Sequence, residues 1–137
     1  MASWIVHLRI AENLLSRIPG LDPAQFAIGN IAPDSGVPDE KWENFTPPPH
    51  ITHFTAGDNH KNFRHTDAIF YRQYVQPLDR MTESGVYALH LGYFFHLIID
   101  NLWRLEIGLP TMQRWAAEFA ADKDFTWEVK RAWYGLD

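Results

Sequence analysis

The spacing of hydrophobic positions predicts that the chain begins with two helices. Apolar side chains recur every three or four residues from position 4 to position 18, which is the period of a helix with one buried face. Ser3 stands before this segment as a helix cap, and a Pro-Gly pair ends it. An Asp-Pro pair then begins a second, shorter helix that runs to Ile31.

Residues 35–59 interrupt the helical pattern. This segment is rich in Pro, Gly and Asp, contains three consecutive prolines and has no regular apolar period. We therefore expect a long Pro-rich loop, and a loop of this length inside a compact domain is usually functional or mobile. His50 and His53 lie within it.

The helical pattern resumes after the loop and predicts four more helices. Their expected ranges are 62–75, 82–107, 111–121 and 125–133. Thr82 stands as the cap of the longest one, and Gly108 and Pro110 are expected to end it. No segment alternates between apolar and polar residues over the length of a strand. The sequence therefore predicts an all-α fold, a bundle of about six helices in a single domain over residues 1–137.

Composition agrees with a globular protein and restricts its chemistry. The 137 residues are 46% hydrophobic and 21% charged, and the formal net charge is −5. A general nucleic-acid binder needs clustered Lys and Arg, so the acidic chain argues against a stable nucleic-acid complex. A nuclease that grips its substrate through metal ions escapes this argument. There is no Cys, so any metal must be held by His, Asp or Glu.

Two features of the chain indicate where the protein is found. The first residues lack the basic start and the apolar stretch of a signal peptide. The longest apolar run, residues 93–99, is too short to span a bilayer. We therefore expect a soluble, cytoplasmic protein without a transmembrane segment.

Two ionisable residues break the apolar pattern of the longest predicted helix. His96 and Asp100 lie within the run YFFHLIIDNLW, where burying a polar group without a partner costs about 2–7 kcal/mol. Residues four apart stand on one face of a helix, so this pair can bind one metal ion together. A buried hydrogen bond, in which Asp100 holds one tautomer of His96, also explains the pair.

Three more residues favour the metal interpretation. His7 lies on the apolar stripe of the first helix, Asp34 ends the sequence GNIAPD, and His53 is flanked by apolar residues in ITHF. Each alone has a structural explanation, as a core histidine or a turn residue. Together with the helical pair they make a set of imidazole and carboxylate ligands that is typical of zinc. Two such ions would activate a water and clamp a phosphoester, with Asp100 as the bridge between them.

The other histidines are weaker candidates. His90 lies six residues before His96, and it either lines the same cleft or faces another helix. His60 and His65 lie in a polar segment, where a solvated histidine is the default.

The order of these motifs resembles the zinc-dependent phospholipase C family, which is related in fold to the zinc-dependent single-strand nucleases. The resemblance runs from residue 4 to about residue 103 and ends with the H-x-x-x-D element of the longest helix. It implies that one zinc is held by Asp34, His53, His96 and Asp100. It also implies that Asp100 bridges to a second zinc held partly by His7, and that Asp34 helps to orient the attacking water.

The sequence also departs from the family pattern. In the secreted phospholipases an N-terminal Trp completes the second site, whereas Trp4 is preceded here by MAS. The third zinc of the family uses two downstream histidines and a Glu, whereas no histidine follows Asp100. Glu106 lies near the place of the first of those histidines and is either a substitute ligand or a solvated helix residue. We therefore expect one or two metal ions, in a member that is shortened at its C-terminal end.

The leading functional expectation is a zinc-dependent hydrolase of the phospholipase C kind, acting on a small phosphoester or a phospholipid. One alternative is a non-catalytic helical protein that uses the same ligands for a structural metal or binds a ligand in its cleft. A metal-free bundle with buried His–Asp pairs is a third interpretation.

Overall fold

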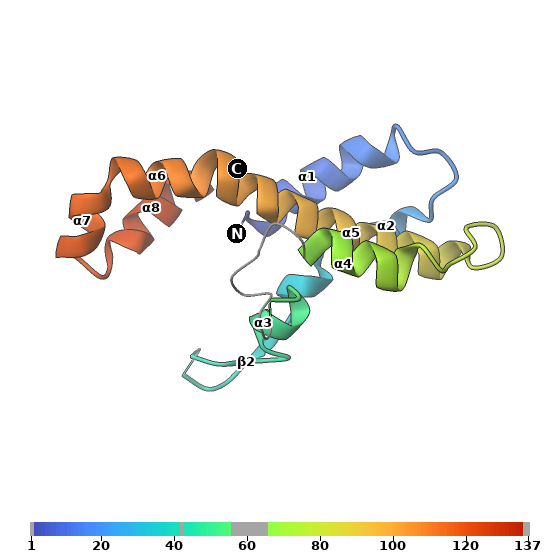
Figure 1. Cartoon of the computed structure of the whole chain (residues 1–137), viewed down its shortest axis with the longest axis horizontal. Coiled ribbons are helices and arrows are strands. Elements are labelled where there is room, and N and C mark those ends of the chain that lie inside the picture. Colours follow the sequence, from blue (N-terminus) through green and yellow to red (C-terminus); the bar gives the residue numbers. More distant parts are fainter. Residues whose placement is uncertain (1, 42, 56–65, 136–137) are drawn as a thin grey trace.

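The protein is described here by a computed structural model that covers residues 2–41, 43–55 and 66–135 (Figure 1). Helices make up most of this part of the chain, which confirms the predicted all-α fold, and one small two-stranded sheet accompanies them. In chain order the elements are α1 (Trp4–Leu15), α2 (Pro23–Ile31), η1 (Ala32–Asp34), β1 (Val37–Pro38), β2 (Phe45–Thr46), α3 (Pro49–Thr52), α4 (Thr66–Phe70), η4 (Tyr71–Val75), α5 (Ser84–Trp103), η5 (Arg104–Gly108), α6 (Leu109–Arg114), α7 (Ala116–Ala121) and α8 (Phe125–Tyr134).

The long helix α5 is the element around which the others are arranged (Figure 1). α1, α2, α4 and η4 all pack against it. The chain continues from α5 through η5 into α6 and turns back through α7 and α8. α8 returns to the C-terminal end of α5, where the rings of Trp103 and Trp133 meet edge to face with their centroids 5.7 Å apart.

Two of the three predicted N-terminal caps are formed. Ser3 Oγ accepts a hydrogen bond from the N–H of Val6 at 3.3 Å, and Asp22 Oδ1 accepts one from the N–H of Gln25 at 3.0 Å. These bonds satisfy backbone donors that have no partner within the first turn of a helix. α1 ends at Leu15, whereas the sequence predicted that this helix would run to about residue 18.

The predicted end of the longest helix at Gly108 and Pro110 is wrong. Gly108 keeps helical dihedral angles, φ −63° and ψ −55°, and the chain enters α6 without leaving the helical conformation. A proline has no N–H to donate, and its ring collides with the preceding turn of a regular α-helix. The wider π-helical turn η5 stands just before Pro110 and gives its ring room.

Three other boundaries differ from the prediction. α5 begins at Ser84 after Glu83, so Thr82 is not its cap. The helix predicted over 111–121 is divided at Trp115, whose φ of −112° and ψ of 31° lie outside the α region. Residues 56–65 lie outside the described residues, so neither the end of the predicted loop nor the start of the next predicted helix is described.

The segment predicted as a Pro-rich loop contains short regular elements. β1 and β2 pair in antiparallel fashion, with Val37 opposite Thr46 and Pro38 opposite Phe45. α3 follows directly, with Pro49 in its first turn, where a missing N–H costs no hydrogen bond. The strands are two residues long, too short to leave an alternating pattern in the sequence.

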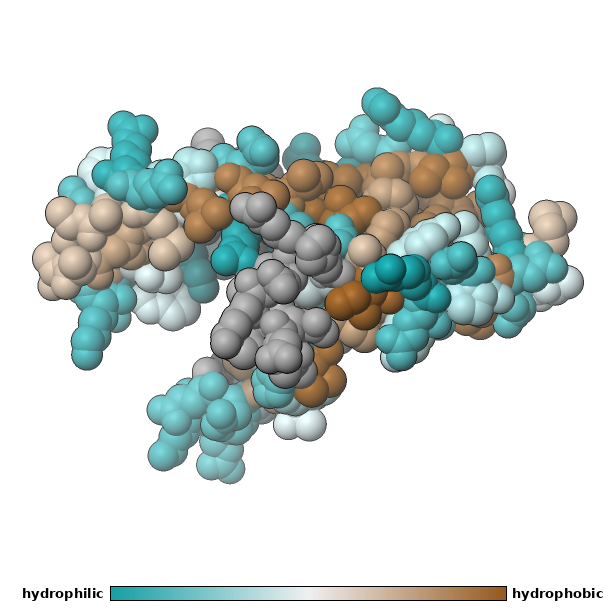
Figure 2. Space-filling model, in the orientation of Figure 1, coloured by the Kyte–Doolittle hydropathy of each residue, from teal (hydrophilic) through white to brown (hydrophobic). Residues whose placement is uncertain are grey.

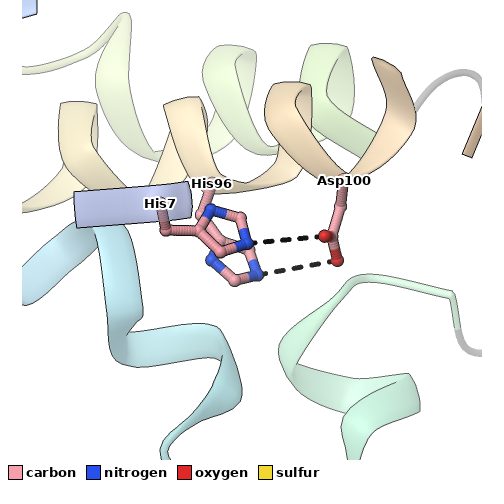
Figure 3. Close-up of side chains that lie close together, drawn as sticks. All are labelled: His7, His96 and Asp100. Carbon is pink, nitrogen blue, oxygen red and sulfur yellow. Dashed lines mark ion pairs between the residues drawn. The ribbon is translucent and has the colours of Figure 1, made fainter. Parts of the chain in front are cut away.

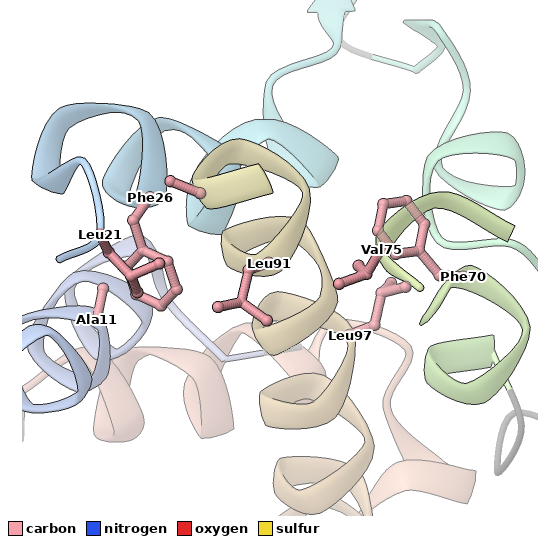
Figure 4. Packing of buried hydrophobic residues seen from close by; sticks show 8 residues of the cluster. Ala11, Leu21, Phe26, Phe70, Val75, Leu91 and Leu97 are labelled. Atoms are coloured by element: carbon pink, nitrogen blue, oxygen red, sulfur yellow. The ribbon is translucent and has the colours of Figure 1, made fainter. Parts of the chain in front are cut away.

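The core lies where the other helices pack against α5 (Figure 4). Its buried hydrophobic side chains are Ala11, Leu21, Phe26, Phe70, Val75, Ala88, Leu91 and Leu97. Strongly hydrophobic residues also reach the surface over the middle of the molecule, along α5 (Figure 2). None of the helices in the described part of the chain combines the length and the apolar character needed to cross a bilayer.

α2 and α5 approach each other most closely at two glycines. A Cβ at Gly29 would lie 2.0 Å from the carbonyl oxygen of Leu89, and one at Gly92 would lie 2.1 Å from the carbonyl oxygen of Phe26. Side chains cannot occupy either position unless the helices move apart. The Nδ2 group of Asn30 donates a hydrogen bond to the Gly92 carbonyl at 3.2 Å, which fixes the relative position of the two helices.

Replacing Gly92 by Ala tests this close approach. We expect Gly92→Ala to lower the free energy of unfolding by about 3 kcal/mol or more, because the added methyl group overlaps backbone that cannot yield locally. Gly85→Ala is the matched control, since the nearest atom to its added Cβ would be Gln25 Cγ at 3.9 Å. In the same helix that change is expected to be neutral or to stabilise by up to about 1 kcal/mol. Urea denaturation followed by circular dichroism measures both, and similar stabilities would contradict the prediction.

Candidate metal centre

The five side chains predicted as metal ligands lie together in one cluster. They come from four separate parts of the chain: His7 from α1, Asp34 from η1, His53 from the residue after α3, and His96 and Asp100 from α5. Figure 3 shows His7 and His96 side by side, with a nitrogen of each ring facing an oxygen of Asp100.

The ligand atoms form two groups that share His96. One group contains His7, His96 and Asp100, and the other contains Asp34, His53 and His96. The Nε2–oxygen distances are 3.5 Å for His7–Asp100, 3.2 Å for His53–Asp34, 3.5 Å for His53–Asp100, 3.9 Å for His96–Asp34 and 3.7 Å for His96–Asp100. Ligands about 2.1 Å from a tetrahedral zinc lie about 3.4 Å from one another. The cluster therefore has the spacing of ligands arranged around an ion.

Backbone carbonyls fix the tautomers of two of these histidines. Nδ1 of His96 lies 2.8 Å from the carbonyl oxygen of Asn30, and Nδ1 of His53 lies 3.0 Å from that of Pro49. A carbonyl only accepts, so each Nδ1 must carry the proton that it donates. Nε2 of each ring is then the nitrogen available to a metal, and this arrangement of Nδ1–H against a carbonyl is common among metal-bound histidines.

The two available nitrogens face each other. Nε2 of His53 and Nε2 of His96 are 3.2 Å apart, in buried surroundings. Two lone pairs at this distance repel, so the contact requires either one proton between the rings or a cation bound to both. Asp34 and Asp100 lie beside the pair and favour either positive charge.

His7 gives independent support for a metal. Its side chain is completely buried, and neither ring nitrogen has a hydrogen-bond partner. The ring stacks on His96 with centroids 3.9 Å apart, which leaves Nε2 directed at Asp100. An unsatisfied buried polar group costs about 1–3 kcal/mol, and an ion between His7 and Asp100 would remove that cost.

Burial and the neighbouring charges shift the pKa values of the two facing histidines in opposite directions. Burial opposes protonation of His53, but Asp100 and Asp34 outweigh it and raise the pKa of His53 to about 9. Burial and the neighbouring His7 lower the pKa of His96 to about 4. Burial alone would raise the pKa of Asp100, yet the imidazole rings of His53 and His7 beside it hold that pKa well below the usual range. Without metal at pH 7, the proton between the rings therefore resides on His53.

Two cavities adjoin the cluster. The larger, of about 530 Å³, reaches His53 and Asp100 and is otherwise lined mainly by apolar side chains of α5 to α8, among them Leu97, Trp103, Met112, Phe119 and Trp133. The second, of about 500 Å³, reaches Asp34 and His53 from the side of α1 and β2. A molecule bound in either cavity would contact the candidate metal ligands.

His90 and Glu106, the two weaker candidates within the described residues, do not join the cluster. Nδ1 of His90 bonds the carbonyl oxygen of Tyr74 at 2.9 Å, and its ring packs among aromatic side chains. Glu106 is exposed on η5 and belongs to neither ligand group. His60 and His65 lie outside the described residues.

Sequence reasoning missed two groups that hold the cluster in place. Asn30 is completely buried, and its carbonyl oxygen orients His96. A polar residue within the run FAIGNI of α2 was the signal that could have revealed it. The backbone N–H of Ala2 donates to Asp100 Oδ1 at 3.0 Å, and a backbone donor leaves no trace in the residue type.

Comparisons with protein-family models, with curated proteins and with solved structures found no match. The resemblance to the zinc-dependent phospholipases C therefore rests on the motifs, and the metal-binding interpretation rests on the geometry.

Loss of either α5 ligand should weaken metal binding strongly. We expect His96→Ala and Asp100→Ala each to lower the affinity for zinc by on the order of 100-fold or more, because each removes an inner ligand. His50→Ala is the control, since this exposed histidine borders the larger cavity but belongs to neither ligand group. Competition with a chromogenic chelator, on protein without a histidine tag, gives the affinities. Equal affinities in all three variants would refute the ligand assignment.

The raised pKa of His53 predicts that metal binding releases a proton. Below about pH 9 this nitrogen is protonated in the metal-free protein, and a metal needs its lone pair. We therefore expect about one proton to be released per zinc bound at pH 7, and the affinity to rise with pH up to about 9. Calorimetry in two buffers with different ionisation enthalpies measures the release. Absence of release at pH 7 would show that no proton occupies the site.

Proposed function

We propose that this protein is a zinc-dependent phosphoesterase of the phospholipase C kind. The observation that carries the proposal is the facing pair of imidazole nitrogens, 3.2 Å apart and flanked by two carboxylates, beside two cavities. Imidazole and carboxylate ligands without thiolates suit zinc. The resemblance in motif order supplies the reaction class.

The ligands divide between two metal positions. Asp34, His53 and His96 would hold the first, with Asp100 as a fourth ligand, and His7 with the other oxygen of Asp100 would contribute to the second. Zinc bound there lowers the pKa of water and stabilises negative charge on a phosphoryl group.

Asp34 is the residue we assign to handling the attacking water. It borders the second cavity, and its Oδ1 lies 3.2 Å from Nε2 of His53. The carboxylate orients the water and accepts its proton while the water oxygen bonds to phosphorus. The ester bond from phosphorus to the alcohol then breaks, and the departing oxygen takes up the proton that Asp34 has accepted.

The larger cavity favours substrates with an apolar group. Its walls are mainly hydrophobic, and Asp100 and His53 lie at its edge. A phospholipid or another phosphodiester with an apolar substituent would bury that substituent while its phosphate met the ligand cluster. Small phosphomonoesters and nucleotides would leave much of this surface uncovered.

An activity assay with a charge-removing variant tests the proposal. The zinc-loaded protein is expected to hydrolyse a chromogenic phosphodiester or a phospholipid and to lose this activity with a chelator. Asp34→Asn should lower kcat by on the order of 100-fold or more, because the amide cannot accept the proton. The control is Asp124→Asn, an exposed residue remote in sequence from the ligand groups.

The metal content of each variant is measured alongside its activity. Inactive Asp34→Asn protein with full zinc supports the water-handling role, whereas loss of zinc assigns Asp34 as a ligand alone. Wild-type protein that binds zinc and hydrolyses no phosphomonoester, phosphodiester or phospholipid would overturn the proposed function in favour of a non-catalytic metal-binding protein.

A further inference from the structure

The two cavities beside the ligand cluster share part of their lining. Three residues belong to both: Pro49, His53 and Lys130. Two of these come from α3 and its end, and the third comes from α8, which is far away in the sequence. A candidate metal ligand and a lysine are therefore both among the residues that the two cavities share.

The surroundings of Lys130 suit an ammonium group held ready beside both cavities. Val129 and Trp133, its neighbours on α8, line the larger cavity, and the side chain of Lys130 is itself half-buried. Its Nζ lies 4.7 Å from the centre of the Trp127 ring. A cation over an aromatic face is attracted only moderately when the ring is exposed, so the ammonium can turn toward a stronger anionic partner.

Lys130 is also distinguished as a positively charged residue that lines both cavities. Among the Lys and Arg residues that the structure describes, Arg104 lines the larger cavity, and Lys130 lines both. The chain as a whole carries a formal charge of −5, and the cluster itself contains two carboxylates. An anion that reaches the cluster gains from a cation that lines the same cavities.

We propose that Lys130 binds the phosphate of the substrate. This inference rests on the proposed function and adds a substrate-contacting residue to it. The ammonium donates hydrogen bonds to a phosphoryl oxygen that the metals do not neutralise, and it interacts more strongly as charge accumulates during attack. A substrate that occupies both cavities would place its phosphate where they share their lining, between His53 and Lys130.

Binding of inorganic phosphate to zinc-loaded protein tests this assignment directly. We expect Lys130→Gln to weaken phosphate binding at least tenfold, measured by calorimetry, with zinc content and thermal stability unchanged. Lys130→Arg keeps the positive charge and should retain most of the affinity. The matched control is Lys123→Gln, an exposed lysine before α8 that lines neither cavity and should bind phosphate like the wild type.

Each outcome of these measurements either supports or overturns the assignment of Lys130 as a phosphate-binding residue. Equal phosphate affinity in Lys130→Gln and the wild type would overturn the inference, as would a wild-type protein that binds zinc but no phosphate. Phosphate binding that depends on Lys130, in a protein that hydrolyses no phosphoester, would support the anion site while overturning the proposed function. Where the wild type is active, the assignment also predicts a lower kcat/KM for Lys130→Gln and partial recovery in Lys130→Arg.

Discussion

The close approach of α2 and α5 is the constraint on which the rest of the structure depends. Glycines at positions 29 and 92 let the two backbones meet where no side chain fits. Because the helices are that close, the carbonyl of Asn30 at the end of α2 reaches the ring of His96 on α5. The next turn of the chain then brings Asp34 beside the same ring. One packing contact thus sets both the core and one half of the candidate metal centre.

The electrostatics of the cluster follow from this arrangement. The carbonyls bonded to His53 and His96 each hold a proton on the outer nitrogen of the ring, so the two inner nitrogens face each other across 3.2 Å. Nearby carboxylates make positive charge between the rings favourable, and burial restricts that charge to one proton or a bound cation. A purely structural His–Asp pair would need one histidine and one carboxylate. The cluster instead contains three histidines and two carboxylates, and one of these histidines, His7, has no hydrogen-bond partner. This set of side chains fits metal binding better.

The continuous helix beyond Trp103 explains why the cluster has a sheltered cavity. Had the helical conformation ended at Gly108, as a glycine at this position suggests, the following helices would have been free to pack elsewhere. Instead η5 leads into α6, which carries the helical chain past Pro110, and α7 and α8 return to close one wall of the larger cavity. The same return brings Lys130 to both cavities, which His53 also lines. The prediction from local residue preferences is wrong at this point because a π-helical turn relieves the steric clash by which proline normally ends a helix.

The sequence by itself determined the helical fold, the caps at Ser3 and Asp22 and the identity of the five clustered side chains, because these depend on local periodicity and on polar residues in apolar surroundings. It also predicted that His96 and Asp100 share one face, since that follows from helix geometry alone. Only the tertiary structure decided which nitrogens face inward, that the two ligand groups share His96 and which residue of α8 comes near them. Those features depend on contacts between segments far apart in the chain, and residue types do not encode the distance at which two helices pack.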